Sequence, residues 1–169
     1  MEHLWSPWRL AYVTGTSEPR GCVFCEAPSR DDGDAMILFR GVTCYVILNL
    51  YPYNCGHLMV VPNRHLASLA ECTPEELNEL MALTRRAEMA LTEAYRPQGL
   101  NIGINLGRSA GAGVVDHVHV HAVPRWTGDT NFMSVVGEVR VLPEELEESA
   151  RRLRPTFERL AAQSPASRT

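Results

Sequence analysis

The chain of 169 residues contains no lysine, and all sixteen of its basic residues other than histidine are arginines. An enzyme that forms a Schiff base with its substrate needs a lysine, and so does the phosphate-binding loop G-x-x-x-x-G-K-[ST]. The sequence therefore excludes pyridoxal-type chemistry and nucleotide hydrolysis at a P-loop.

The sequence also lacks long apolar stretches and an excess of positive charge. No window approaches the roughly 18 consecutive apolar residues of a membrane-spanning helix, and no basic segment followed by an apolar one opens the chain. We therefore expect no membrane association and a cytoplasmic location. The formal net charge of −4 offers no attraction for a polynucleotide backbone, so we expect no nucleic-acid polymer as a partner.

Five cysteines, an odd number in a chain without a recognisable export signal, argue against a disulfide framework. The hydrophobic content of 45% is typical of a globular protein, and the sequence shows neither an internal repeat nor a long linker. We predict a single domain over residues 1–163, with its core at 22–135, and a disordered tail at 164–169.

Local patterns predict strands in the first half of the chain. Apolar segments rich in β-forming residues lie at 34–39 and 42–50, and Gly41 between them indicates a hairpin. The proline, asparagine and glycine residues of 51–56 predict a loop, after which 57–62 resumes as a strand.

Two helices are expected in the second half. T-P-E-E at 73–76 combines an N-cap, a proline at the first helical position and the acidic residue of a capping box, and this helix should end near Tyr95. The last helix is expected to begin at Pro143 and to be interrupted near Pro155.

The segment D-H-V-H-V-H-A-V-P-R-W places three of the six histidines at alternate positions. In an extended strand His117, His119 and His121 would share one face, with apolar side chains on the other. Their spacing of roughly 6.6 Å along the strand is too long for the three to coordinate one ion together. We therefore expect them to have different roles, in a strand that ends at Pro124.

A strand predicted at 100–106 is followed by the small residues G-R-S-A-G-A-G at 107–113. Several main-chain N–H groups of such a loop can converge on an anion. A glycine-rich loop alone is more often a plain turn, but its place directly before three histidines favours phosphate binding.

The motif C-V-F-C at 22–25 supplies two soft metal ligands on one turn. Zinc prefers four ligands in a tetrahedron, and His65 and His117 are candidates to complete a Cys₂His₂ set. A structural zinc would then join the two halves of the chain. The alternatives for Cys22 and Cys25 are a redox pair and simple burial.

If His117 faces a metal, His119 lies in the middle of the strand, opposite the glycine-rich loop. A neutral imidazole can attack phosphorus and form a phosphoramidate. His121 would hydrogen-bond a leaving-group or bridging oxygen, while N–H groups of the loop stabilise charge on the phosphoryl oxygens.

The segment H-V-H-V-H-A-V-P-R resembles the His-φ-His-φ-His-φ-φ pattern of the histidine triad (HIT) superfamily, which includes the Hint, Fhit and galactose-1-phosphate uridylyltransferase branches. C-V-F-C, L-N-L-Y-P-Y-N-C-G-H-L-M-V-V-P-N-R-H and G-L-N-I-G-I-N-L-G look like further landmarks, so the resemblance covers roughly residues 22–126. It implies an α+β, HIT-like fold, in which an antiparallel sheet is joined by one long helix and a C-terminal helix, and a homodimer.

Two further segments, L-W-S-P-W-R-L-A-Y-V and P-R-W-T-G-D-T-N-F-M, resemble the bacterial branch that contains diadenosine tetraphosphate phosphorylases. The resemblance implies cleavage at the α-phosphate of a dinucleoside polyphosphate through a nucleotidyl-histidine, which phosphate or water then resolves. The alternatives are a nucleoside phosphoramidate hydrolase and a nucleotide-binding signalling protein with incidental turnover. No organic cofactor is expected.

The resemblance also implies roles for single residues. His119 would be the nucleophile, and His121 and His57 complete the expected catalytic group. Asn49, eight residues before His57, would contact the ribose, and Asn105 would meet the phosphates. The ligands of the zinc-containing bacterial members correspond to Cys22, Cys25, His65 and His117.

The chain departs from the pattern just before the triad. Many Hint and Fhit members carry Gln-Ser or Gln-Thr where this chain has Gly113 and Val114, so side-chain contacts to phosphate are missing. Ser109 and main-chain N–H groups are expected to replace them. Trp126 either packs or shapes the polyphosphate side of the site. The nucleotide-binding residues predicted in full are Asn49, Asn105, Gly107, Ser109, Gly113, Val114, His119 and His121.

Overall fold

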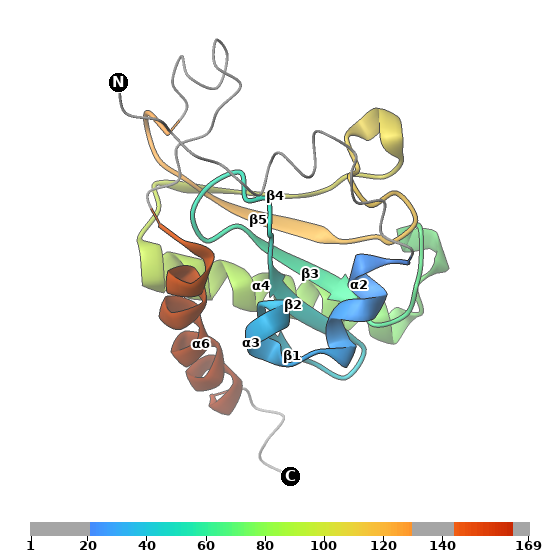
Figure 1. The fold of residues 1–169 in the computed structure, drawn as a ribbon, viewed down its shortest axis with the longest axis horizontal. Coiled ribbons are helices and arrows are strands. Elements are labelled where there is room, and N and C mark those ends of the chain that lie inside the picture. Colours follow the sequence, from blue (N-terminus) through green and yellow to red (C-terminus); the bar gives the residue numbers. More distant parts are fainter. Residues whose placement is uncertain (1–20, 130–143, 164–169) are drawn as a thin grey trace.

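The computed structural model describes residues 21–129 and 144–163. Its core is a five-stranded antiparallel sheet of order β1-β2-β3-β5-β4 (Figure 1). The strands are β1 Ile37–Arg40, β2 Cys44–Leu48, β3 Leu58–Pro62, β4 Gly99–Ile104 and β5 Val120–Arg125. The α-helices are α2 Val23–Glu26, α3 Asp32–Ala35, α4 Pro74–Tyr95 and α6 Leu146–Ala162, and 3-10 turns lie at Ala27–Ser29, Leu69–Glu71 and Arg108–Ala110. The predicted α+β fold with one long helix and a C-terminal helix is confirmed.

The long helix α4 begins and ends where the sequence predicts. The Thr73 side chain accepts the amide of Glu76, and the Glu76 carboxylate accepts the amide of Thr73, so the expected capping box is formed. The helix ends at Tyr95, and Arg96 follows in the left-handed conformation.

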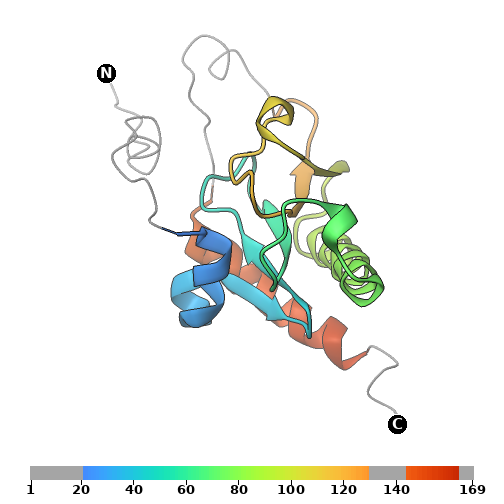
Figure 2. The ribbon, with the colours of Figure 1, turned by 90° about the vertical axis from the view of Figure 1, so that its right-hand side faces the viewer.

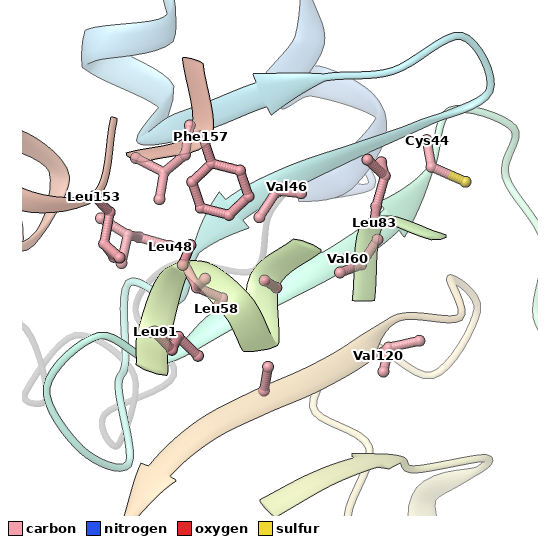
Figure 3. Packing of buried hydrophobic residues seen from close by; sticks show 14 of the residues in the cluster. Cys44, Val46, Leu48, Leu58, Val60, Leu83, Leu91, Val120, Leu153 and Phe157 are labelled. Atoms are coloured by element: carbon pink, nitrogen blue, oxygen red, sulfur yellow. The ribbon is translucent and has the colours of Figure 1, made fainter. Parts of the chain in front are cut away.

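Alternating side chains of the central strands fill two cores on opposite faces of the sheet. On one face β2 and β3 pack against α4 and α6 (Figure 3). The β2 and β3 residues of this core are Cys44, Val46, Leu48, Leu58 and Val60. On the other face Tyr45, Ile47, Met59 and Val61 pack with α2 and α3, which lie on the opposite side of the sheet from α4 (Figure 2).

The same alternation decides where the histidines point. Val120 and Ala122 of β5 belong to the core beneath α4. His121 between them therefore faces the other side of the sheet, the side on which α2 lies. The fold thus places the histidines and the C-V-F-C motif on one face.

Several predicted strand boundaries are wrong. Asp34 and Ala35 belong to α3, because the Asp31 carboxylate caps a helical turn by accepting the amide of Gly33 at 2.8 Å. The first strand therefore begins only at Ile37, and the second and third are also shorter than expected.

The histidine strand differs from the prediction at both ends. The paired ladder begins at Val120, so His117 and His119 precede it. It continues through Pro124 to Arg125, because β3 pairs with β5 only as far as Ala122 and leaves Pro124 beside β4 alone. A proline without an N–H is tolerated at such a local edge.

The C-terminal helix begins at Leu146, with Glu145 as its N-cap, and the predicted start at Pro143 lies outside the described residues. It is not interrupted at Pro155. The neighbouring side chains of Leu153 and Phe157 are fully buried in the core, and this packing offsets the roughly 3 kcal/mol that a proline costs inside a helix.

The N-terminal limit predicted for the domain and the predicted tail at 164–169 lie outside the described residues. The N-terminal segment that carries the resemblance lies outside them too, as do residues 130–133 of the segment after the triad. Among the helices that the structure describes, none has the length and apolar character needed to cross a membrane. The cytoplasmic location stays a prediction.

Candidate active site

The structure gathers the three predicted catalytic histidines in the interior. His57 is fully buried, and His119 and His121 are 3% and 9% exposed. The ring centroids of His119 and His121 lie 4.7 Å apart, and those of His57 and His121 lie 5.1 Å apart. The imidazole rings of neighbouring histidines are therefore in direct contact.

A main-chain carbonyl fixes the protonation of His119. Its Nδ1 lies 2.8 Å from the oxygen of His117, which can only accept a hydrogen bond. The proton is therefore on Nδ1, and Nε2 carries a lone pair. Burial lowers the pKa of His119, and the ring of Phe24 packs against it with a centroid distance of 4.8 Å. His119 is thus held as the neutral imidazole that nucleophilic attack requires.

A chain of hydrogen bonds fixes the protonation of His57 and His121. The amide of Tyr53 donates to Nδ1 of His57 at 3.1 Å, so this nitrogen is unprotonated. Nε2 of His57 then carries the proton and donates it to Nδ1 of His121 at 2.9 Å. His121 consequently keeps its own proton on Nε2, as a hydrogen-bond donor. Burial and the neighbouring His119 lower the pKa of His121 to about 4, which keeps its ring neutral.

The loop before β3 holds the hydrogen-bonded pair of His57 and His121 in place. The Tyr53 ring lies 4.6 Å from that of His57. Asn49 accepts the amide of Tyr51 through Oδ1 at 2.9 Å, which turns its Nδ2 toward Nδ1 of His57 at 3.3 Å. The predicted ribose contact of Asn49 stays a prediction.

Strand β4 borders the histidines on the other side. Gly103 pairs with His121, and open space lies where a side chain at Gly103 would stand. The register ends with Ile104 opposite Val120, and the half-buried Asn105 and the buried His119 are the next residues beyond this end of the ladder. This position is compatible with the predicted phosphate contact.

The glycine-rich loop forms one 3-10 turn, with Gly107 and Gly111 in conformations of positive φ, +82° and +88°. The amides of Ala110, Gly111 and Ala112 bond to carbonyls inside the loop, so they are not available to an anion. The contacts predicted for the rest of the loop stay predictions, at Gly107, Ser109, Gly113 and Val114.

The four predicted metal ligands come together at His117, the first histidine of the segment that holds the three alternate histidines. Each of the four residues offers one ligand atom, and these atoms all lie within 4.8 Å of one another. The residues are Cys22, Cys25, His65 and His117. Nε2 of His117 lies 2.9 Å from the oxygen of Pro62 and therefore carries the proton, which leaves Nδ1 free to coordinate.

The spacing of these atoms fits a tetrahedral ion. Bonds of about 2.3 Å to sulfur and 2.0 Å to nitrogen separate the two atoms by roughly 3.5 Å. The structure places Nδ1 of His117 at 3.2 Å from Cys22 Sγ and 3.6 Å from Cys25 Sγ, and Nδ1 of His65 at 3.3 Å from Cys25 Sγ. Desolvation and the adjacent Cys22 raise the pKa of the Cys25 thiol.

Sequence reasoning missed two aromatic residues of the site. Phe24 lies between the two cysteines of the motif, and its ring contacts both His117 and His119. Tyr53 stands four residues before His57, and only its position in the loop pointed to it. Trp126 forms an edge contact with Tyr95 at 6.3 Å, which agrees with the packing alternative.

Comparison with known proteins gives consistent matches. The HIT domain family model matches residues 31–128. A protein of Mycobacterium tuberculosis named AP-4-A phosphorylase is 41% identical over 161 residues, 90% of this chain and 83% of the relative. The bis(5'-nucleosyl)-tetraphosphatase [asymmetrical] of Schizosaccharomyces pombe is 34% identical over 95 residues, 56% of this chain and 52% of the relative.

A solved structure is similar over most of the chain. It is a Zn-bound histidine triad family protein from Mycobacterium smegmatis, with a TM-score of 0.68 and 33% identity over 85% of this chain and 98% of that chain. Together the matches confirm the family and its phosphorylase-like branch as the ones that this sequence resembles. The chain belongs to the HIT domain family.

Proposed function

We propose that this protein cleaves dinucleoside polyphosphates, such as diadenosine tetraphosphate, at the α-phosphate through a nucleotidyl intermediate on His119. The observation that carries the proposal is the opposite protonation of two adjacent rings. His119 presents an unprotonated Nε2, while His121 presents a protonated one. The names of the Mycobacterium tuberculosis and Schizosaccharomyces pombe relatives support an enzyme with this class of substrate.

In the first step Nε2 of His119 attacks the α-phosphorus, and the bond from that phosphorus to the bridging oxygen breaks. His121 donates a hydrogen bond from Nε2 to the departing oxygen. ATP leaves, and the adenylyl group stays on His119. In the second step an oxygen of inorganic phosphate or of water attacks the same phosphorus and releases His119, which gives ADP or AMP.

The nucleotide contacts complete the proposal. Asn49 would hold the ribose and Asn105 the α-phosphate. The glycine-rich loop would bind the polyphosphate through Ser109 and through main-chain groups of Gly107, Gly113 and Val114. Asn105 is half-buried and follows the last residue of β4, at the end of the ladder next to His119 in sequence register, and this position supports its part in the set.

We propose zinc as the ion of the four-residue cluster. When bound, zinc would supply a cross-link between the segment before β1 and the histidine segment. Support comes from the donor spacing and from the donor set of two thiolates and two imidazoles. The ion has no part in the proposed steps at His119.

The homodimer is also a proposal. Strand β4 ends the sheet, and its Ile102 side chain is 43% exposed. An exposed sheet edge of this kind is suited to pairing with a second copy. Sedimentation of wild-type protein and of Ile102→Lys tests this, with a dimer expected for the first and a monomer for the second.

The proposed activity is tested by chromatography of the products formed from diadenosine tetraphosphate with and without inorganic phosphate. ADP plus ATP, formed only with phosphate, indicates a phosphorylase, and AMP plus ATP in both cases indicates a hydrolase. Faster turnover of adenosine phosphoramidate would favour the Hint-like alternative. Tight nucleotide binding without multiple turnover would favour the signalling protein.

A further inference from the structure

We propose that Asn54, anchored on Asp129, is a positioning residue that determines which nitrogen of His121 carries the proton. The inference deepens the proposed function, because it assigns a role to residues of two loops in the reaction at His119.

The first step is the anchor. Nδ2 of Asn54 donates to the carboxylate of Asp129 at 2.9 Å and to the main-chain oxygen of Pro124 at 3.1 Å. The Asp129 side chain is only 9% exposed, and Arg125 holds it in a two-pronged ion pair with contacts of 2.6 and 2.8 Å. The amide of Trp126 adds a third donor at 3.1 Å. This carboxylate is therefore a fixed acceptor for Asn54.

The second step leads from Asn54 to His57. The main-chain oxygen of Asn54 accepts the amide of His57 at 3.2 Å, while the amide of the preceding residue, Tyr53, donates to the His57 ring at 3.1 Å. Both ends of this short turn thus meet His57. The side chain of Asn54 ties the same turn to the end of β5, so the direction of the Tyr53 amide depends on the anchor.

The third step is the consequence for His121. As long as the Tyr53 amide donates to Nδ1 of His57, the His57 proton must be on Nε2, which donates to Nδ1 of His121. If the amide turns away, Nδ1 of His57 keeps the longer contact from Nδ2 of Asn49 at 3.3 Å. A share of the His57 rings can then exchange this contact for a proton on Nδ1. His121 would then donate from Nδ1 to His57, and its Nε2 would present a lone pair to the substrate oxygens in place of a proton.

The test uses Asn54→Asp in the full chain. This substitution keeps the shape of the side chain but sets a second acceptor against the Asp129 carboxylate and the Pro124 oxygen. Asn63→Asp is a matched control, because Nδ2 of Asn63 donates to the main-chain oxygen of Val42, also at 3.1 Å. Any general effect of exchanging an amide for a carboxylate beside a carbonyl appears in both variants.

The first readout is long-range ¹H–¹⁵N NMR of the imidazoles, which distinguishes protonated from unprotonated ring nitrogens. Wild-type protein and Asn63→Asp are expected to show Nε2-protonated rings for His57 and His121. Asn54→Asp should show a population with the protons on Nδ1. The second readout is turnover, and kcat should fall roughly 10- to 100-fold in Asn54→Asp while KM changes little, because the loss concerns a donor used in the reaction step.

Two results would overturn the proposal. One is a His57 ring protonated on Nδ1 in the wild-type protein, which needs no variant at all. The other is wild-type imidazole signals and wild-type kcat in both Asn54→Asp and Asp129→Asn, of which the second removes the charge of the anchor. If the wild-type protein cleaves no dinucleoside polyphosphate, the proposed function fails, and the NMR signals of the same samples still decide whether Asn54 sets the tautomers.

Discussion

The main-chain oxygen of His117 lies 2.8 Å from Nδ1 of His119, so a residue of the four-residue Cys/His cluster orients the proposed nucleophile. The ring of His117 has its Nδ1 toward the sulfur of Cys22, and its Nε2 donates a hydrogen bond to the main-chain oxygen of Pro62. One residue thus serves the cluster through its side chain and the active site through its backbone. In the proposed mechanism the cluster supports the site and has no part in the reaction at His119.

Cys22→Ser is expected to abolish zinc binding and to lower the free energy of unfolding by at least about 2 kcal/mol, or roughly 4–8 °C in Tm for a chain of this size. Molecules that remain folded should keep part of their activity. Metal analysis and calorimetry measure both effects. Cys72→Ser is the control, because Cys72 lies outside the cluster and bonds to Ser68. If wild-type protein that is expressed and purified with ample zinc contains no bound zinc, the zinc proposal is refuted.

The stability of the fold should depend on the neutral state of His121. Its pKa of about 4 in the folded chain lies below the ordinary value of 6.5, because the ring is buried beside His119. Between these values the unfolded chain binds more protons than the folded one, so the free energy of unfolding should fall as pH decreases from 6.5 to 4 and change little from this source below 4. The loss is about 3 kcal/mol.

Urea unfolding across this pH range measures the effect, with His121→Gln as the comparison. The variant cannot titrate at this position and should lose less stability on acidification than the wild type. Since protonation of the metal ligands affects both proteins alike, the difference between the two curves isolates His121. Parallel curves would show that His121 is not the source.

Gly56→Ala should destabilise the turn that holds His57. Gly56 has a φ of +72°, and an added Cβ would stand 2.7 Å from a ring carbon of Tyr95. Strain in the left-handed region and this clash should together cost about 2 kcal/mol or more. Gly99→Ala is the matched control, since open space surrounds its Cβ position. Equal unfolding midpoints for the two variants in urea would contradict this view of the turn.

Local signals in the sequence were sufficient for the helix α4. Its start depends on side chains within one turn, and Pro97 and Gly99 follow its last turn. T-P-E-E therefore predicts the observed start, and these two residues predict an end near Tyr95, where the structure has it. The burial that lets Pro155 remain inside α6 depends on distant core residues, and no local rule predicts it.

Alternate spacing and the family resemblance were sufficient to predict which residues form the four-residue cluster and which histidines lie together in the candidate active site. The tautomers were not predictable. They depend on the carbonyls of His117 and Pro62 and on the amide of Tyr53, which only the folded backbone brings to the rings. The anchor of Asn54 on Asp129 joins residues 75 positions apart, so spacing could not reveal it either.

The central claim is that His119 becomes covalently nucleotidylated, and the most direct measurement is mass spectrometry of enzyme mixed with diadenosine tetraphosphate and quenched rapidly in alkali, where a phosphoramidate survives. The account predicts an adenylyl adduct mapped to His119 in the wild-type protein. In His119→Asn it predicts a folded protein with neither adduct nor turnover. An adduct on another residue, or undiminished turnover in His119→Asn, would contradict the account.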